Sequence, residues 1–137
     1  MKMNPYLTFG GDCEAAFKFY EKTLGGTIEA MFTHEDTPMA DEVPADWRKK
    51  IMHASLKVGG GLLMGSDAPA PSREALAGFS VSLQIEDPAE AERVFQALAA
   101  NGTVKMPIQE TFGALRFGML VEQFGVPWMV NCDRPEA

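Results

Sequence analysis

Two segments of the chain have helical periodicity, and each lies among shorter segments in which apolar and polar residues alternate. The clearer helical segment follows Asp87, a candidate N-cap, with Pro88 at the first helical position and Glu90 placed to complete a capping box. Asn101-Gly102 marks its end. Its apolar positions recur with a helical period, which predicts one buried face made of Ala91, Val94, Phe95, Leu98 and Ala99.

The earlier helical segment begins after Asp12, also a candidate N-cap, and ends at Gly25-Gly26. Its predicted buried face consists of Ala15, Ala16, Phe19, Tyr20 and Leu24.

One short extended segment precedes each predicted helix, at residues 6–9 and 79–85, and a predicted hairpin follows each helix. In the first hairpin, residues 52–58 place His53, Ser55 and Lys57 on one face and apolar residues on the other, and glycines at 59–61 then turn the chain. The second hairpin turns near Phe124-Gly125. Residues 34–50 are acidic and irregular, and we interpret them as a candidate lid.

The two halves of the chain carry a short repeat. Gly60 and Met64 of the first hairpin recur as Gly125 and Met129 in the second. Six earlier positions recur 76 residues later: Glu14, Ala15, Phe19, Gly26, Thr27 and Ile28 match Glu90, Ala91, Phe95, Gly102, Thr103 and Val104. We therefore predict an α+β fold of two βαβββ modules, at 1–67 and 78–133, joined by a linker at 68–77. Pairing the two sheets would form a cup whose concave side is the natural ligand site.

This arrangement resembles the PhnB-like branch of the vicinal oxygen chelate superfamily, which contains glyoxalase I, extradiol dioxygenases and bleomycin resistance proteins. The resemblance covers nearly the whole chain. Its motifs are NPYLTF at 4–9, CEAAFKFY at 13–20, His53-Ala54, Gly59-Gly60, LMGSD at 63–67, GFS at 78–80, QETF at 109–112, Phe117-Gly118 and FGVPWMVN at 124–131. It implies a single glyoxalase/bleomycin resistance domain over 1–137 that is expected to form a homodimer.

Composition narrows the choice of partners. The chain has 137 residues, of which 46% are hydrophobic and 23% charged, as in an ordinary globular domain. Its net charge of −7 disfavours nucleic acid and anionic membranes, which leaves small molecules or proteins. We find no apolar segment long enough for a secretory signal or a membrane span, so we expect a cytoplasmic protein. Its two cysteines, Cys13 and Cys132, are therefore expected to be reduced.

Metal-dependent relatives place His and Glu ligands on the first and last strands of each module. Matched through the helix motif, this chain has Pro5 and Met64 in the first module and Ser80 and Met129 in the second. Because these side chains offer thioethers, one hydroxyl and no carboxylate or imidazole, we predict that the chain holds no metal and no cofactor. The sequence also has only two histidines, His34 and His53. His34 belongs to the acidic cluster His34-Glu35-Asp36, which is a weaker candidate for a metal site.

The catalytic candidates are His53 and Glu110, which are suited to proton transfer, and Arg116, which is suited to clamp an anionic ligand or to form an ion pair with Glu110. His53 also has a purely structural interpretation, as a residue hydrogen-bonded to a neighbouring strand. Side chains expected near the cup form the predicted ligand site: Leu7, Phe9, His53, Ser55, Met64, Ser80, Ser82, Gln84, Gln109, Trp128 and Met129.

These features predict a metal-independent protein that binds a small apolar or aromatic molecule. An alternative is a metal-dependent lyase, isomerase or dioxygenase with ligands drawn from His34, His53 and Glu110. Some members of this branch carry the label 3-demethylubiquinone 3-methyltransferase, but Gly59-Gly60-Gly61 joins two hairpin strands rather than leading into a cofactor-binding helix. A purely structural dimer is the remaining alternative.

Overall fold

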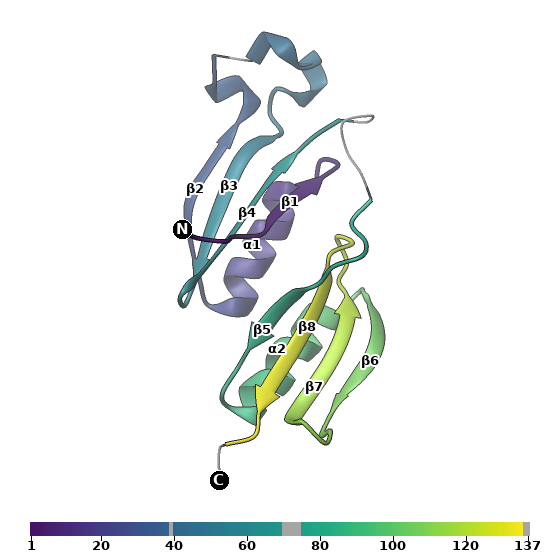
Figure 1. Ribbon diagram of the computed structural model, residues 1–137. Helices are drawn as coiled ribbons and strands as arrows, with labels where there is room; N and C mark the ends of the chain where they lie inside the picture. The colour runs from purple at the N-terminus through teal and green to yellow at the C-terminus, as the bar shows by residue number, and fades with distance from the viewer. Residues whose placement is uncertain (39, 70–74, 136–137) are drawn as a thin grey trace. The chain divides into compact units, whose positions relative to one another are not determined.

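The computed structural model describes residues 1–38, 40–69 and 75–135. The chain divides into two compact units, Met1–Ala75 and Leu76–Ala137. Each unit contains one helix and one four-stranded mixed sheet, which confirms the predicted α+β glyoxalase fold (Figure 1). The boundary between the units falls within the expected linker 68–77, of which residues 70–74 lie outside the described residues.

The first unit is built in the order strand, helix and three strands. These elements are β1 (Tyr6–Phe9), α1 (Cys13–Leu24), β2 (Thr27–Thr33), β3 (Ile51–Val58) and β4 (Gly61–Asp67). The strands lie in the order β1-β4-β3-β2, with β1 parallel to β4 and the other neighbours antiparallel. Hairpin β3–β4 turns where the glycine cluster predicted it, with Gly59 at a φ of +55°.

The acidic segment between β2 and β3 contains three short 3-10 turns rather than a strand or a long helix: η1 (His34–Asp36), η2 (Ala40–Glu42) and η3 (Ala45–Trp47). A capping box joins Thr33 and Asp36 at the start of η1. The His34 ring is bonded through Nε2 to the carbonyl oxygen of Asp67, 3.2 Å away, so η1 is fastened to the end of β4.

The second unit repeats the same order of elements: β5 (Val81–Gln84), α2 (Pro88–Ala99), β6 (Thr103–Gln109), β7 (Ala114–Val121) and β8 (Pro127–Asp133). Its strand order is β5-β8-β7-β6, with β5 parallel to β8. The two units therefore share one topology, as the sequence repeat predicted.

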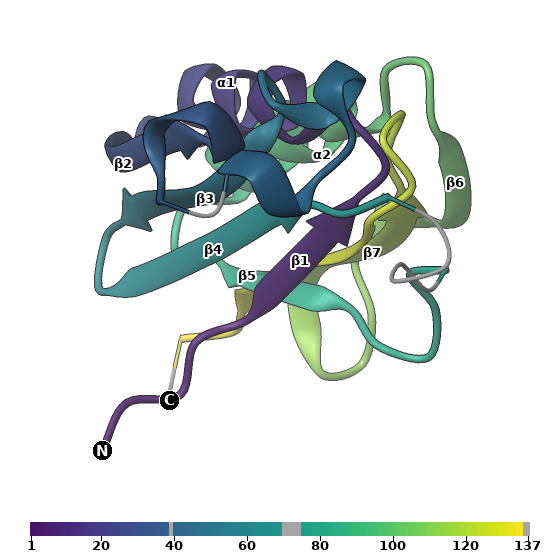
Figure 2. The ribbon, with the colours of Figure 1, turned by 90° about the horizontal axis from the view of Figure 1, so that it is seen from above.

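Each helix covers one face of its own sheet, and a glycine in the sheet lets an aromatic ring approach closely. Figure 2 shows α1 on one side of its sheet. A Cβ added at Gly65 would lie 2.8 Å from the Phe17 ring, and one added at Gly118 would lie 2.6 Å from the Phe95 ring. Both positions therefore require glycine for packing rather than for a turn.

The buried face of α1 differs from the prediction. It consists of Cys13, Ala16, Phe17, Tyr20 and Thr23, whereas Ala15 is exposed and Phe19 and Leu24 are half-buried. The repeat aligns Phe19 with the buried Phe95, but Phe17 is the aromatic residue that packs on the sheet. The buried face of α2 was predicted correctly at Ala91, Val94, Phe95 and Leu98; Ala99 is half-buried.

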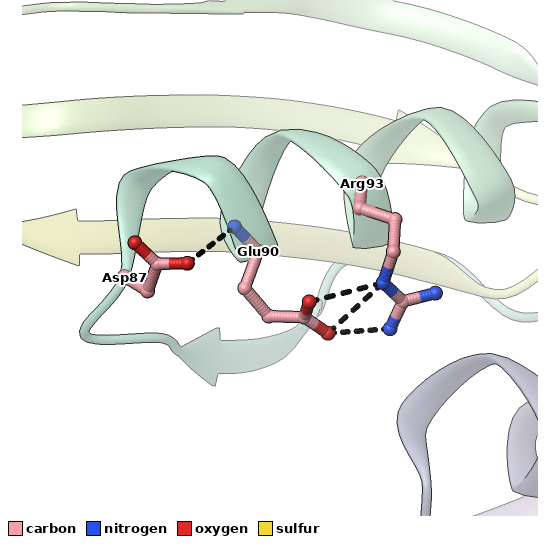
Figure 3. A network of polar contacts seen from close by, with 3 residues as sticks. All are labelled: Asp87, Glu90 and Arg93. Carbon is pink, nitrogen blue, oxygen red and sulfur yellow. Dashed lines mark hydrogen bonds and ion pairs between the residues drawn. The ribbon is translucent and has the colours of Figure 1, made fainter.

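Helix α2 begins as predicted, with one difference (Figure 3). The Asp87 carboxylate accepts a hydrogen bond from the Glu90 backbone N–H, 3.1 Å away, and Pro88 follows the cap. The Glu90 side chain does not complete the expected capping box, since its carboxylate accepts hydrogen bonds from the Arg93 guanidinium. Among the helices in the described parts of the chain, none is sufficiently long and apolar to span a membrane.

Candidate functional site

The strand register defines an open face in each sheet, opposite the face covered by the helix of that unit. In the first unit Tyr6 pairs with Met64 and Met64 pairs with Ser55, so these three side chains share the open face. Ser55 is buried and Met64 half-buried, whereas Tyr6 is 48% exposed. The predicted ligand residues His53, Ser55 and Met64 thus lie on one surface of one sheet.

Three rings form a row across the open face of the first sheet, which we call the aromatic row: Tyr6, His53 and Phe32. Phe32 pairs with His53 between β2 and β3. The His53 ring lies 5.8 Å from the Tyr6 ring and 5.7 Å from the Phe32 ring, measured between centroids. The Tyr6 hydroxyl is 3.2 Å from His53 Nδ1, within hydrogen-bond distance.

Methionines lie side by side on the open face of the second sheet. Met106 pairs with Met119 and Met119 with Met129, so a methionine row crosses β6, β7 and β8, and Ser82 of β5 pairs with Met129 at its end. Paired side chains on adjacent strands are close enough to touch, and methionine adapts its shape to apolar partners.

A more polar row lies next to the methionine row. Gln84 pairs with Asn131, Asn131 with Phe117, and Phe117 with Gln109. The Asn131 amide donates to the Gln84 side-chain oxygen and to the Asp133 carboxylate, each at 2.7 Å. The structure thus places Ser82, Gln84, Gln109 and Met129 on one face, as we expected. Ser80 is half-buried and precedes β5.

Three predicted ligand residues lie on the opposite, helix-covered face, which corrects our placement of them near the cup. Leu7 pairs with Gly65 beneath Phe17, and the Phe9 ring contacts the Phe17 ring edge-on. Trp128 is 1% exposed. All three belong to the hydrophobic cores of their units. In β1, Leu7 and Phe9 point to one face and Tyr6 and Thr8 to the other. We assigned the wrong set to the open face, which amounts to a shift of one residue in the strand.

Arg116 and Glu110 do not pair with each other. Arg116 Nε lies 3.0 Å from the Glu92 carboxylate on α2, which places its guanidinium on the helix side of the sheet. Glu110 instead pairs with Arg134, at 3.0 Å, and Arg134 also donates to the carbonyl oxygen of Thr111. The expected ion pair between Arg116 and Glu110 is therefore wrong, and Arg116 pairs with Glu92 instead.

Strand pairing places other residues beside Met64 and Met129 than those that the sequence match named. Tyr6 rather than Pro5 lies beside Met64, and Ser82 rather than Ser80 lies beside Met129. Tyr6 and Ser82 are 76 residues apart, the spacing of the repeat. A phenol and a thioether in the first unit, and a hydroxyl and a thioether in the second, do not supply the imidazole and carboxylate ligands that Zn, Ni, Mn or Fe sites use.

Within the parts of the chain that the structure describes, no group of three or more His, Cys, Asp or Glu side chains could hold a metal ion. In the His34-Glu35-Asp36 cluster, His34 is bonded to the Asp67 carbonyl oxygen and the Asp36 carboxylate to Thr33. The cluster is thus engaged in local structure.

Sequence reasoning missed two buried carboxylates with structural roles. Asp67 accepts hydrogen bonds from the backbone N–H groups of Gly11, Cys13 and Ile51. Glu122 accepts from the N–H groups of Phe124 and Val126 in the β7–β8 turn. Both acids stand at the ends of apolar strand segments, which was the only signal that they were more than surface charges.

Both cysteines are free and buried. Burial, followed by the negative charges of Asp67 and Glu14, raises the pKa of the Cys13 thiol far above its ordinary value. A position at a helix N-terminus therefore does not acidify Cys13.

Comparison with known proteins identifies the family. The family model described as the Glyoxalase/Bleomycin resistance protein/Dioxygenase superfamily matches residues 2–130. Protein YjdN of Escherichia coli (strain K12) is 35% identical over 139 residues, covering 96% of this chain and 95% of YjdN. The crystal structure of protein PA1353 from Pseudomonas aeruginosa is 49% identical, with a TM-score of 0.88 over 98% of this chain and 99% of that chain.

The PhnB protein of Bacillus cereus has a similar fold, with a TM-score of 0.81 at 24% identity over 96% of this chain and 99% of that chain. The chain belongs to the glyoxalase/bleomycin resistance/dioxygenase superfamily, and it has PhnB-like structural neighbours.

Proposed function

We propose that this protein binds a small apolar or aromatic molecule on the open faces of its sheets, and that it does so without a divalent metal. The observation that carries the proposal is the strand register. It places Met64 beside Tyr6 in the first unit and Met129 beside Ser82 in the second, at the strands that supply metal ligands in metal-dependent relatives.

The chemistry of these faces supports an apolar ligand. The first face presents the aromatic row and Met64, and the second presents the methionine row. Thioethers and aromatic rings gain stability from contact with apolar surface, and methionine-rich faces accept partners of varied shape. Gln84, Asn131 and Gln109 can orient a polar group of such a ligand.

Methionine methyl groups allow a direct test. With 13C-labelled methionine methyls, a library of apolar and aromatic compounds is screened by NMR. We expect a hit to shift the signals of Met64, Met119 and Met129, while Met31, which pairs with the buried Ala54 on the helix side, stays unchanged. Met64→Gln should weaken binding of a hit on the first face, and Met31→Gln is the matched control.

Metal analysis of the same purified protein separates the two leading functions. The proposal predicts that ligand binding is unchanged after exhaustive chelation. Stoichiometric Zn, Ni, Mn or Fe that is lost together with binding would overturn it in favour of a metal-dependent lyase, isomerase or dioxygenase. A screen in which no compound perturbs any open-face methionine would also reject it.

A further inference from the structure

We infer that the Tyr6–His53 pair gives the first open face a specific preference: it recognises a flat aromatic molecule through a carbonyl or phenolate oxygen. This inference rests on the proposed function, since it names the ligand class of the same face. The group that makes the contact is the Nε2–H of the His53 ring, which has the Tyr6 and Phe32 rings as neighbours.

The aromatic row suits a flat ligand. The Tyr6 and His53 rings are inclined by 32°, and the Phe32 and His53 rings by 43°. All three rings rise from the same face of the sheet on three different strands, and Tyr6 and Phe32 remain 48% and 36% exposed. A planar ligand that covers the row removes apolar ring surface from water at little entropic cost, because the rings are already ordered.

The hydrogen bond from Tyr6 determines which His53 nitrogen faces the ligand as a donor. A neutral imidazole carries one N–H and one acceptor nitrogen, and the partner of one nitrogen fixes the role of the other. The Tyr6 hydroxyl lies 3.2 Å from Nδ1, and we assign the hydroxyl as the donor because a phenol O–H is more acidic than a neutral imidazole N–H. The proton of the ring therefore resides on Nε2, and the face presents an N–H donor rather than an acceptor.

The N–H donor of the His53 ring favours a ligand that carries a hydrogen-bond acceptor. In the part of the chain that the structure describes, the Tyr6 hydroxyl is the one hydrogen-bond partner of the His53 ring. A ligand oxygen that accepts from Nε2–H would satisfy the remaining donor, whereas a pure hydrocarbon would cover it and leave it without a partner. An aromatic ring that carries a carbonyl or phenolate oxygen combines both requirements.

The second unit does not carry this arrangement, which assigns the preference to the first face. The residue equivalent to Tyr6 is Ser82, whose neighbours across the sheet are Met129, Met119 and Met106. A hydrocarbon part of the ligand is suited to either face, but the His53 N–H donor occurs on the first.

The scarcity of histidine makes the tautomer directly measurable. The protein has two histidines, and His34 is an internal reference, because its Nε2 faces a carbonyl oxygen and must donate. Long-range 1H–15N spectra of 15N-labelled protein at neutral pH should show the Nε2–H tautomer for both rings. Tyr6→Phe should add the Nδ1–H form for His53 and leave His34 unchanged. A His53 signal of the Nδ1–H form in the wild-type protein would overturn the inference.

The ligand preference is tested with acetophenone and ethylbenzene, which have similar size but differ by a carbonyl group. The quantity to compare is the ratio of their affinities, since the cost of dehydrating the carbonyl group is the same for every variant. We expect His53→Phe to lower the preference for acetophenone roughly threefold to tenfold, as loss of one hydrogen bond should. Tyr6→Phe should lower it less. Phe112→Leu, which alters an exposed ring in the second unit, should leave it unchanged.

The outcomes separate this inference from the proposed function. In the wild-type protein, acetophenone should shift His53 Nε2 well beyond the ring-contact shift that ethylbenzene causes, a measurement that requires no variant to fold. If both probes shift the Met64 methyl and the affinity ratio is the same in His53→Phe, the inference fails and the proposed function stands. If acetophenone leaves His53 unperturbed, the inference is likewise overturned.

Discussion

The Asp67 carboxylate, at the end of β4, accepts a hydrogen bond from the backbone N–H of Cys13, with Oδ1 3.0 Å from the nitrogen at the start of α1. The same oxygen accepts from the Gly11 N–H at 2.9 Å, and Oδ2 accepts from the Ile51 N–H at 3.0 Å. One buried carboxylate therefore joins the helix N-terminus to two strands of the sheet. It takes the role we predicted for Asp12, which makes no side-chain cap.

Asp67→Asn should destabilise the protein by about 2–4 kcal/mol. The substitution removes the charge from three hydrogen bonds and points an amide N–H₂ at a backbone N–H that needs an acceptor. Urea unfolding at pH 7 measures the loss. Asp46→Asn is the control, because Asp46 is exposed on η3 and should change stability little. Equal stability of the two variants would contradict the role of Asp67.

The fold followed from the sequence because its determinants are local and repeated. Alternation in the strands, the Asp87-Pro88 start of α2 and the glycine turns each specify an element without reference to the rest of the chain. Asp67 was overlooked because its function depends on N–H groups that are more than fifty residues away for Gly11 and Cys13. No local pattern distinguishes such a carboxylate from a surface charge.

The candidate site was predicted less well, and strand register is the reason. Two of the three misplaced ligand residues, Leu7 and Phe9, are in β1, where a shift of one position puts Tyr6 and Thr8 on the open face instead. Tyr6 was thereby overlooked as the partner of His53. Partners of long side chains, such as Glu92 for Arg116, also depend on where α2 lies over the sheet.

Gly65→Ala should cost about 1–3 kcal/mol, the usual range for overpacking a well-filled core. The new methyl group would lie 2.8 Å from the Phe17 ring and 3.0 Å from the Leu7 carbonyl oxygen, so the helix must move away from the sheet. Gly60→Ala is a matched control in the adjacent turn, since nothing lies within 4 Å of a Cβ there. Thermal and urea unfolding should show that Gly65→Ala is much less stable than Gly60→Ala. The reverse order of stabilities would contradict the packing of α1 against Gly65.

Cys13 should resist thiol reagents in the folded protein. Burial and the charges of Asp67 and Glu14 raise its pKa, so the thiol stays protonated well above neutral pH and gains little reactivity between pH 7 and 9. Iodoacetamide should modify it on the order of 100-fold more slowly in buffer than in urea, since access requires local unfolding. Peptide mapping by mass spectrometry follows the site directly. Rapid modification of Cys13 in native protein would show that the start of α1 opens readily.

Arg116→Gln should reduce stability by roughly 0–1 kcal/mol and leave ligand affinity unchanged, because its partner Glu92 is on the helix side and both side chains are partly exposed. Thermal unfolding and titration of a hit from the ligand screen measure the two effects. Glu92→Gln should reduce stability by a similarly small amount. The double variant should lose less stability than the sum of the two single variants. Strong loss of ligand affinity in Arg116→Gln alone would restore Arg116 as an anion clamp.

Asp36 should make the stability of the first unit depend on acidic pH. The backbone N–H of Thr33, followed by its hydroxyl, lowers the pKa of the Asp36 carboxyl below its ordinary value of 3.8. Because the folded pKa is the lower one, the stabilisation is complete above the ordinary value and is lost as the pH falls through the folded pKa. Asp36→Asn should therefore lower the free energy of unfolding at pH 7 and have a smaller effect at pH 3.

The control for this prediction is Glu35→Gln, which removes the same charge one residue earlier without altering the capping box. Amide hydrogen exchange of Thr33 adds a local readout: protection of its N–H should decrease in Asp36→Asn at pH 7 and should be kept in Glu35→Gln. If Asp36→Asn lowers the free energy of unfolding as much at pH 3 as at pH 7, the carboxylate charge is not what stabilises η1. The stabilisation would then come from side-chain packing, which protonation leaves in place.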